Sequence, residues 1–389
     1  MGMHLSQEEE RAYQGELGDG LRRAMEILVA LGDIYGADRL IPVRSVQVAG
    51  VSFKTIGEAG LEWISDLRGR VVVPAVLNPA GMDLTRWQQM GIDERFAEKQ
   101  IEVIEAYRRL GISADCTCTP YQIRPDLARR GDHLAWSESS AVSFANSVIG
   151  AKTNREGGPS ALAAALVGKT PRYGYHLEEK RVPTINIAVD SDLEASDYGI
   201  LGYIVGKEVG DGVPRFIFRR RPDIDELKAL GAAMAASGSV ALYYFDEDAP
   251  AAPEGSEEIL VSDRDLQDLR EESAPDDEVD VVAIGCPHSS ERELAEVARL
   301  LEGKKVERQL WICTARAIAE RRTDLVAKIE RSGARVFCDT CMVVSPASDR
   351  YRKMMVNSGK ALAYVPTLCK MKAAYGSVEE CVGAATRRV

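Results

Sequence analysis

The class of the fold follows from the stretch Val279-Asp280-Val281-Val282-Ala283-Ile284-Gly285-Cys286-Pro287-His288. It begins as a short apolar run, which predicts a buried strand over 279–284, and it leads into a helical pattern from Ser290. Similar runs follow at 309–313 and 335–337, each preceded by a helical pattern. Strands that alternate with helices are typical of parallel sheets. The sequence therefore predicts an α/β protein with mainly parallel sheets.

The same alternation extends over the rest of the chain. Further strands are expected at 70–77, 112–119, 184–189, 215–218, 240–245 and 361–365. Further helices are expected at 92–110, 195–206 and 224–236, and from near Ser140 and Pro159. Residues 246–258 are acidic and contain two prolines, which predicts a loop between lobes.

The length of the chain and the grouping of these patterns indicate more than one domain. A chain of 389 residues is long enough for two or three domains. The patterns fall into three groups, which meet near residues 181 and 275. We predict three α/β lobes around a central cleft, formed by residues 1–181, 182–275 and 276–389. Ligands of such sheets gather beyond the carboxyl ends of the strands.

Charge and composition argue against several classes of protein. The formal net charge of −11 disfavours nonspecific nucleic-acid binding, which needs a basic face. No apolar run approaches the length of a membrane span. The N-terminal residues 1–10 are polar and acidic, unlike a secretory signal. We therefore expect a cytoplasmic protein without nucleic-acid or membrane partners, whose eight cysteines are thiols or metal ligands rather than disulfides.

Three cysteines are placed where predicted strands end. Cys118 and Cys286 close the strands near 112–119 and 279–284, and Cys341 follows the strand at 335–337. Soft thiolates suit an iron–sulfur cluster or zinc. We expect these three to be the metal ligands, with Cys116 and Cys338 as open alternatives to one of them. The remaining cysteines lie in apolar or helical segments and are expected to fill the core: Cys313, Cys369 and Cys381.

A polar block at residues 135–160 predicts a pocket for a small anionic or hydroxylated ligand. Arg155 is expected to grip a carboxylate or phosphate with two hydrogen bonds. Glu156 is expected to act as an acid, to orient Arg155, or to serve as a structural carboxylate. The backbone amides of Gly157 and Gly158, ahead of a helix, suit an anion. The remaining predicted ligand contacts are Asn78, Ser139, Ser140, Asn154 and Lys360.

Several of these blocks, in this order along the chain, resemble the large subunit of the aconitase X family. They are Cys118-Thr119-Pro120-Tyr121, Trp136-Ser137-Glu138-Ser139-Ser140-Ala141, Phe144-Ala145-Asn146-Ser147, Thr153-Asn154-Arg155-Glu156-Gly157-Gly158-Pro159-Ser160, Gly285-Cys286-Pro287-His288 and Asp339-Thr340-Cys341-Met342-Val343-Val344. The resemblance implies an aconitase-like fold and a hydro-lyase. It also implies an iron–sulfur cluster held by the cysteines. Three thiolates would leave one iron of a [4Fe-4S] cubane open, which favours that type, with three-iron and two-iron clusters as the alternatives. In archaeal members the substrate is (R)-5-phosphomevalonate, which loses water to give trans-anhydromevalonate 5-phosphate in a mevalonate pathway.

The resemblance further implies a heterodimer. In archaeal aconitase X the mobile small domain is a separate small subunit, which is expected to carry the main base. Bacterial relatives imply a second substrate, cis-3-hydroxy-L-proline. Two other hypotheses compete with the cluster-dependent dehydratase: a zinc enzyme that uses the same cysteines, which would be colourless rather than brown, and a non-catalytic scaffold.

Overall fold

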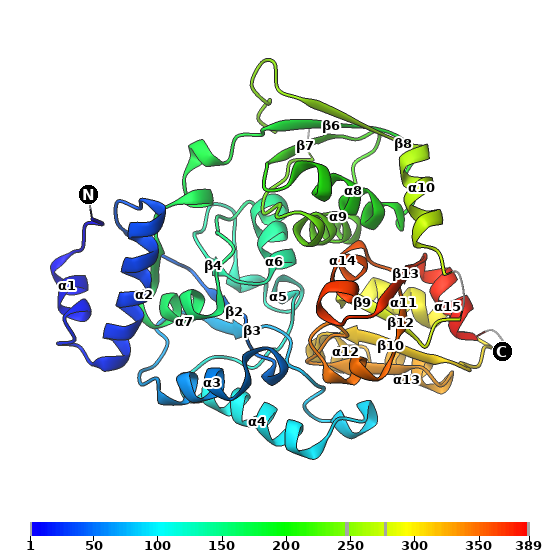
Figure 1. The fold of residues 1–389 in the computed structure, drawn as a ribbon, viewed down its shortest axis with the longest axis horizontal. Helices are drawn as coiled ribbons and strands as arrows, with labels where there is room; N and C mark the ends of the chain where they lie inside the picture. The colour runs from blue at the N-terminus through cyan, green and yellow to red at the C-terminus, as the bar shows by residue number, and fades with distance from the viewer. Residues whose placement is uncertain (1, 246–248, 276–277, 387–389) are drawn as a thin grey trace.

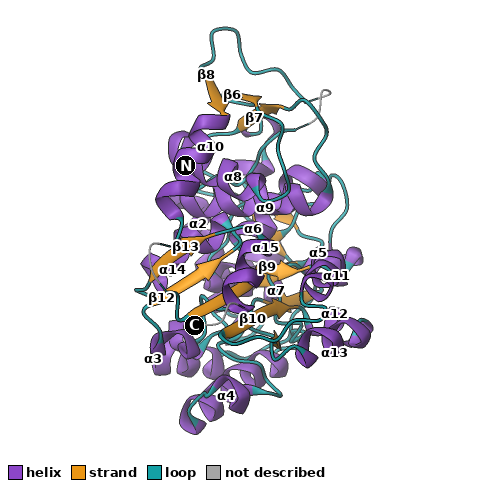
Figure 2. Cartoon of the chain, turned by 90° about the vertical axis from the view of Figure 1, so that its right-hand side faces the viewer, coloured by secondary structure: helices purple, strands orange, loops and turns teal. Residues whose placement is uncertain are grey.

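A five-stranded parallel sheet forms the C-terminal part of the computed structural model, which describes residues 2–245, 249–275 and 278–386. The strands, in spatial order, are β11 (Arg335–Cys338), β10 (Gln309–Thr314), β9 (Val281–Ser289), β12 (Lys353–Val356) and β13 (Lys372–Tyr375). Figure 2 shows β13, β12, β9 and β10 side by side. Every residue of the central strand β9 is buried, as expected for a parallel sheet with both faces covered. The accompanying helices are α11 (Glu291–Leu300), α12 (Arg316–Arg321), α13 (Thr323–Arg331), α14 (Gly359–Leu368) and α15 (Val378–Thr386).

The N-terminal part contains a second parallel sheet, of spatial order β3-β2-β4, and an antiparallel pair of β1 with β5. The strands are β1 (Leu40–Pro42), β2 (Val46–Val48), β3 (Ala75–Leu77), β4 (Ala135–Trp136) and β5 (Lys169–Pro171). The helices are α1 (Gln7–Tyr13), α2 (Asp19–Tyr35), α3 (Phe53–Asp66), α4 (Glu94–Arg109), α5 (Pro120–Ile123), α6 (Ser139–Phe144) and α7 (Gly158–Val167), with a π-turn at Ala145–Ile149 and 3-10 turns at Trp87–Met90 and Pro125–Leu127. Helix α7 packs between α2 and β2, which places the polar block beside the sheet.

The middle part consists of a third parallel sheet and two long helices. Its strands, in spatial order, are β7 (Pro214–Ile217), β6 (Ile185–Asp190) and β8 (Glu258–Ser262). Its helices are α8 (Asp197–Val209), α9 (Ile224–Ser237) and α10 (Asp263–Ser273), and further 3-10 turns lie at Gly174–His176, Glu178–Lys180 and Pro346–Arg350. Helices α8 and α9 lie between this sheet and the C-terminal part (Figure 1). Because α9 contacts both α6 and α14, it joins all three parts of the chain.

The mainly parallel α/β class is confirmed, but three predicted strands are wrong. Residues 361–365 lie in helix α14, whose first turn is capped by the Ser358 hydroxyl accepting from the Ala361 amide at 3.2 Å. The segment 240–245 joins the third sheet only through a bridge between Tyr244 and Arg215 of β7, at the edge of the sheet opposite β8. The segment 112–119 makes one bridge, at Ser113, because Cys116 adopts a φ of 41° that ends the extended run.

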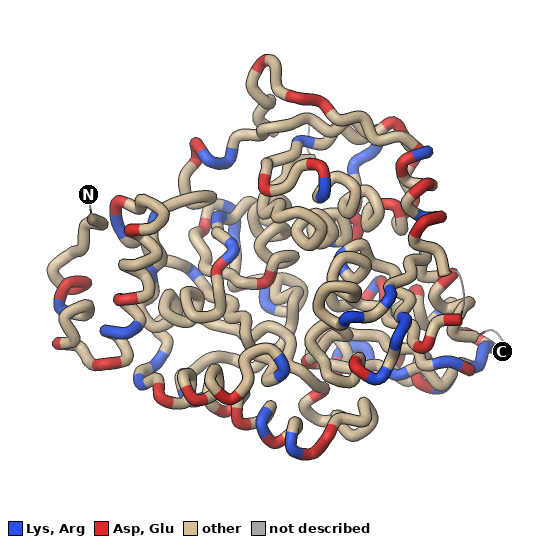
Figure 3. Tube along the Cα trace, in the orientation of Figure 1, with Lys and Arg blue, Asp and Glu red and all other residues tan. Residues whose placement is uncertain are grey.

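The acidic segment is only partly covered by the structure. Residues 246–248 lie outside the described residues, 249–257 are irregular as predicted, and strand β8 begins at Glu258. Acidic residues outnumber basic ones along α3 and α10, as Figure 3 shows. No helix in the described part of the chain has the length and apolar character to cross a membrane.

Candidate active site

The three predicted ligand cysteines line one cavity of about 510 Å³. Cys118 lies in the loop just before α5, and Cys341 lies in the loop after β11. Cys286 lies in β9, where Gly285 adopts a φ of 101° and the register with β10 shifts. All three are buried. Cys286 and Cys341 reach this place because the carboxyl ends of β9 and β11 face it, and the loop before α5 adds Cys118.

Two influences act on the ionisation of these thiols in opposite directions: burial disfavours the thiolate, and a nearby positive charge and backbone amides favour it. Burial raises the pKa of all three, that of Cys118 to about 12, while the positive charge of Lys360 acts in the opposite direction. The His288 amide donates to Cys118 Sγ at 3.2 Å. Backbone amides of Val343 and Val344 act in the same way on Cys341. Since metal ligation requires thiolates, these donors and the lysine charge provide the stabilisation that burial removes.

His288 connects the segments that carry the cysteines. Its ring is fully buried, with Nε2 at 2.8 Å from the Thr340 carbonyl oxygen and Nδ1 at 3.0 Å from the Thr117 hydroxyl. Because a carbonyl only accepts, Nε2 carries the hydrogen and Nδ1 accepts from the hydroxyl. Burial lowers the pKa of His288 to about 4. The neutral ring therefore ties the loops next to Cys118 and Cys341 to strand β9.

A buried ion pair forms one wall of the cavity. Lys360, in the first turn of α14, pairs with Glu138, which immediately precedes α6. Burial opposes the charge of both groups, but their mutual attraction prevails, so the pKa of Glu138 is lowered and that of Lys360 is raised. Asn78 Nδ2 donates to the second carboxylate oxygen at 2.9 Å, and the Ser140 hydroxyl accepts from Lys360 at 3.0 Å. Glu138 is thus held as a carboxylate with a fixed orientation.

Arg155 lies in the same cavity with its charge uncompensated by an ion pair. Its guanidinium donates to the Tyr364 hydroxyl at 3.3 Å and to the Ala235 carbonyl at 3.5 Å. Within residues 2–245, 249–275 and 278–386, no carboxylate lies within ion-pair distance of it. The Tyr364 hydroxyl also lies 3.4 Å from that of Ser139. The cavity therefore offers a planar cation to an incoming anion.

Five of the predicted site residues lie outside the lining of this cavity: Ser140, Asn154, Glu156, Gly157 and Gly158. Asn154 is engaged with Tyr173 and Tyr175, whose carbonyl and amide its side chain binds at 3.1 and 2.8 Å. Glu156 accepts from the hydroxyls of Ser160, at 2.6 Å, and Thr170, at 3.1 Å. Burial raises the pKa of Glu156. These contacts of Glu156 join α7 to β5, as expected for the structural carboxylate that was one of its three predicted roles.

Gly157 and Gly158 support the wall rather than face the cavity. A Cβ on Gly158 would lie 2.7 Å from the Ala49 carbonyl oxygen, so glycine allows α7 to approach the loop 49–52 closely. That loop lines the cavity. The other predicted contacts do meet there: Asn78, Ser139, Arg155 and Lys360 line the cavity, and Ser140 touches Lys360.

Sequence reasoning missed Glu138 and Tyr364. Glu138 stands within the quoted block 136–141, where its charge beside two serines was the available signal. Tyr364 follows Lys360 by one helical turn, a spacing that places both on one face of α14. The strand predicted at 361–365 hid this relation, because an extended chain rises about 3.3 Å per residue and would hold the two residues about 13 Å apart, whereas a helix brings them side by side.

A second ionic network holds the loop of Asn78 against that of Cys341. Arg316 donates to Asp83 at 2.9 Å and also pairs with Asp339. The second oxygen of Asp83 accepts from the Cys338 amide at 2.8 Å, and the Ala80 amide donates to the Asp339 carbonyl at 2.7 Å. Both carboxylates are buried. The network thereby sets the distance between two walls of the cavity.

Within the described part of the chain, no three histidine, cysteine or carboxylate side chains converge tightly enough to bind a single metal ion. A cluster places its thiolates on different irons, so its ligands need not meet at one point.

Comparison with known proteins gives consistent matches along the chain. Family models for the first, second and third domains of aconitase X match residues 2–179, 183–271 and 279–387. The phosphomevalonate dehydratase large subunit of Methanosarcina mazei is 56% identical over 99% of this chain and 97% of its own length. That of Methanothermobacter thermautotrophicus is 52% identical over 96% of both chains.

More distant matches and a solved structure extend the comparison. The cis-3-hydroxy-L-proline dehydratase of Pseudomonas aeruginosa is 33% identical over 99% of this chain, which spans 70% of that protein. The crystal structure of the holo-form of Thermococcus kodakaraensis aconitase X superposes with a TM-score of 0.91 at 46% identity, covering 98% of this chain and 100% of the other.

Proposed function

The chain belongs to the aconitase X family, and on this basis we propose that it is the large subunit of a phosphomevalonate dehydratase. The reaction removes water from (R)-5-phosphomevalonate and gives trans-anhydromevalonate 5-phosphate. The observation that carries the proposal is the cavity in which three cysteines from separate segments meet Arg155 and the Lys360–Glu138 pair.

The donor set of this cavity fits an iron–sulfur cluster. We propose Cys118, Cys286 and Cys341 as its ligands and a [4Fe-4S] type, because three thiolates leave one iron of a cubane open. The amides directed at the sulfur atoms of Cys118 and Cys341 support this assignment. Such a cluster supplies a Lewis acid for the departing hydroxyl.

The chain's own residues bind and orient the substrate. Arg155 binds the phosphate or carboxylate through two parallel hydrogen bonds, since its charge is not spent on a carboxylate of the described chain. Lys360 contributes a positive charge close to the cysteines, and Glu138, fixed by Asn78, keeps the ammonium in place. The Ser139 hydroxyl lies beside Tyr364, where both are available to substrate oxygens. We place the base that removes the α-proton on a separate small subunit.

The relatives favour a phosphorylated substrate. The archaeal proteins at 48–56% identity are named phosphomevalonate dehydratase large subunits, and this chain spans 95–99% of their lengths. The hydroxyproline dehydratases are only 32–33% identical and are longer, since the chain spans 69–70% of them. The name "large subunit" of these archaeal relatives supports a two-subunit enzyme. A cytoplasmic location accords with eight buried free thiols.

The test is a dehydration assay on the chain co-expressed with its small subunit and loaded with iron and sulfide under anaerobic conditions. We expect turnover of (R)-5-phosphomevalonate by the two-subunit enzyme, little by the isolated chain, and little with cis-3-hydroxy-L-proline. A preference for hydroxyproline, or full turnover by the isolated chain, would overturn the proposal.

A further inference from the structure

The side chain of His288 lies where the three chain segments that carry the proposed ligand cysteines meet. Its Nδ1 accepts from the Thr117 hydroxyl at 3.0 Å, and its Nε2 donates to the Thr340 carbonyl at 2.8 Å. Each threonine directly precedes one of the cysteines, and His288 follows the third by two positions. One imidazole therefore joins the segments of all three proposed ligands.

This ring is placed to hold the segments and not to bind a substrate. His288 is fully buried and is absent from the lining of the cysteine cavity. A buried polar ring is costly unless its nitrogens are hydrogen-bonded, whereas an apolar side chain would fill the same space without that requirement. What histidine adds at this position is two nitrogens that hold two separate loops.

Both loops need such support, because each contains a strained residue directly before its threonine. Cys116, which precedes Thr117, adopts a φ of 41°. Asp339, which precedes Thr340, adopts a φ of 63°. A residue with a side chain is strained in this region of backbone conformation and stays there only where its surroundings hold it. The hydrogen bonds of the two threonines to His288 are among the contacts that hold the loops.

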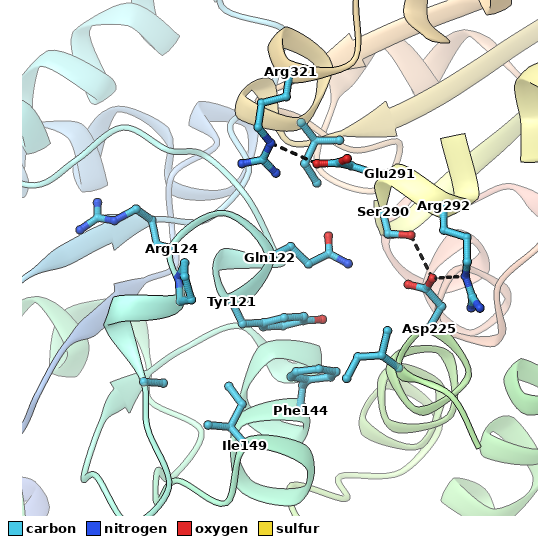
Figure 4. A pocket seen from close by; sticks show the side chains of 14 residues that line it. Tyr121, Gln122, Arg124, Phe144, Ile149, Asp225, Ser290, Glu291, Arg292 and Arg321 are labelled. Atoms are coloured by element: carbon cyan, nitrogen blue, oxygen red, sulfur yellow. Dashed lines mark hydrogen bonds and ion pairs between the residues drawn. The ribbon is translucent and has the colours of Figure 1, made fainter. Parts of the chain in front are cut away.

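The backbone that carries the ring is itself fixed on two sides. The Thr314 hydroxyl of β10 donates to the Ser289 carbonyl at 2.7 Å. The Ser290 hydroxyl donates to Asp225, the second residue of α9, at 3.0 Å (Figure 4). His288 is thus attached to the C-terminal sheet and to α9, so its position does not depend on the loops that it holds.

The segment of Cys118 receives more than one of these constraints. The His288 amide donates to the Cys118 Sγ at 3.2 Å. The Thr119 amide donates to the Thr117 hydroxyl at 3.1 Å, so the hydroxyl that donates to the ring also closes the turn around the cysteine. Removal of this one hydroxyl would therefore release Cys118 from both the ring and the turn.

We propose, on the basis of the cluster assignment above, that His288 is a positioning residue. It holds the thiols of the three cysteines at fixed separations, so that a cluster binds without rearrangement of the loops. Groups that orient metal ligands in this way commonly change metal retention by about 10- to 100-fold when they are removed. Loss of either ring hydrogen bond should therefore weaken the hold on the cluster.

Two variants of Thr117 test the role of the ring. Valine has nearly the shape of threonine but lacks the hydroxyl, whereas serine keeps it. Each full-length chain is loaded with iron and sulfide under anaerobic conditions, and the loss of cluster absorbance to an excess of iron chelator is followed. We expect Thr117→Val to lose iron about tenfold faster than the wild type, and Thr117→Ser to lose it at the wild-type rate. His288→Phe removes both ring hydrogen bonds and should lose iron at least as fast as Thr117→Val.

A matched control and a second measurement separate a loosened site from a damaged fold. His176 is also buried, but its ring partner is His133, at 3.0 Å, and not a loop that carries a cysteine. We expect His176→Phe to retain iron as the wild type does. Melting curves verify that each chain is folded. In the iron-free chains, alkylation of Cys118 by iodoacetamide, followed by mass spectrometry of its peptide, should be severalfold faster in Thr117→Val than in Thr117→Ser.

The outcomes distinguish this role from the proposed function. The role of His288 is overturned if folded Thr117→Val and His288→Phe chains lose iron at the wild-type rate, or if Thr117→Ser loses it as fast as Thr117→Val. If His288→Phe does not fold, the two Thr117 variants decide. A wild-type chain that takes up no iron overturns the cluster assignment and this role with it. No substrate enters the assay, so an error in the proposed substrate leaves the result unchanged.

Discussion

Replacing Glu138 with glutamine should destabilise the fold far more than the loss of one charge at the surface would. The side chains of Lys360 and Glu138 are only 6% and 16% exposed. The variant leaves the ammonium buried without its counter-charge, whereas the wild type holds both charges in place with Asn78 and Ser140. An unpaired buried charge is among the most costly defects that a single substitution creates.

The loss in free energy of unfolding expected for Glu138→Gln depends on the contacts that Lys360 keeps in the variant. Removing one partner of a buried ion pair costs about 3–5 kcal/mol. The Ser140 hydroxyl still accepts from Lys360 at 3.0 Å, and the new amide oxygen accepts as well, so we expect a loss of about 2–4 kcal/mol. The matched control is Glu178→Gln, because Glu178 pairs with Lys152 while its side chain is 75% exposed. We expect that control to change stability by less than about 1 kcal/mol.

The pH dependence of the free energy of unfolding distinguishes the Glu138–Lys360 pair, because the pKa values of the two groups shift in opposite directions. The pKa of Glu138 is lowered, so its contribution is present above the ordinary value of 4.5 and is lost as the pH falls through the lower value of the folded chain. The pKa of Lys360 is raised, so its contribution is present below 10.5 and is lost as the pH rises through the higher folded value. The difference between wild type and Glu138→Gln should therefore be constant between these limits and shrink both in acid below 4.5 and in base above 10.5.

Urea unfolding followed by fluorescence and circular dichroism measures the effect, with each transition analysed separately because a chain of several lobes need not unfold in one step. The double variant Glu138→Gln/Lys360→Met should recover part of the loss, since it leaves no charge buried alone. The reasoning is refuted if Glu138→Gln unfolds at the same urea concentration as Glu178→Gln, or if the double variant loses the sum of the two single losses.

Three further outcomes are expected. Arg155→Lys should raise KM for the phosphorylated substrate by about tenfold while iron content and melting temperature hold, because an ammonium lacks the planar fork; an unchanged KM removes Arg155 from the binding site. Cys286→Ser should lose bound iron and activity, whereas Cys381→Ser, buried near the C-terminal end, should keep both, and iron analysis decides. Arg316→Met should cost about 3 kcal/mol or more, because Asp83 and Asp339 stay buried without their cation; equal denaturation midpoints for Arg316→Met and the surface control Arg322→Met would contradict the role of this network.

The sequence-based prediction of the strands succeeded where burial dominates. Strand β9 is buried along its whole length, so it contains the continuous apolar run 281–284. That run predicts a strand without any information about the neighbouring strands. The segment 361–365 is equally apolar, yet it forms part of α14 because Ser358 caps the helix and β12 and β13 already occupy that edge of the sheet. A short apolar run fits either structure until its neighbours are known.

The amino-acid sequence by itself determined the chemistry available to this protein: the α/β class, the family, and the cysteines placed where predicted strands end. Residue type and periodicity are sufficient for the α/β class and for the cysteine positions, whereas the family followed from the resemblance of the motif blocks. Which polar residues meet was decided only by the tertiary structure. Arg155 and Glu156 are adjacent in the chain, but one faces the cysteine cavity and the other is buried against Thr170. Glu138 and Lys360 are 222 positions apart, and they form their pair because the packing of α6, α9 and α14 brings the two helix starts together. No local signal in the sequence encodes that contact.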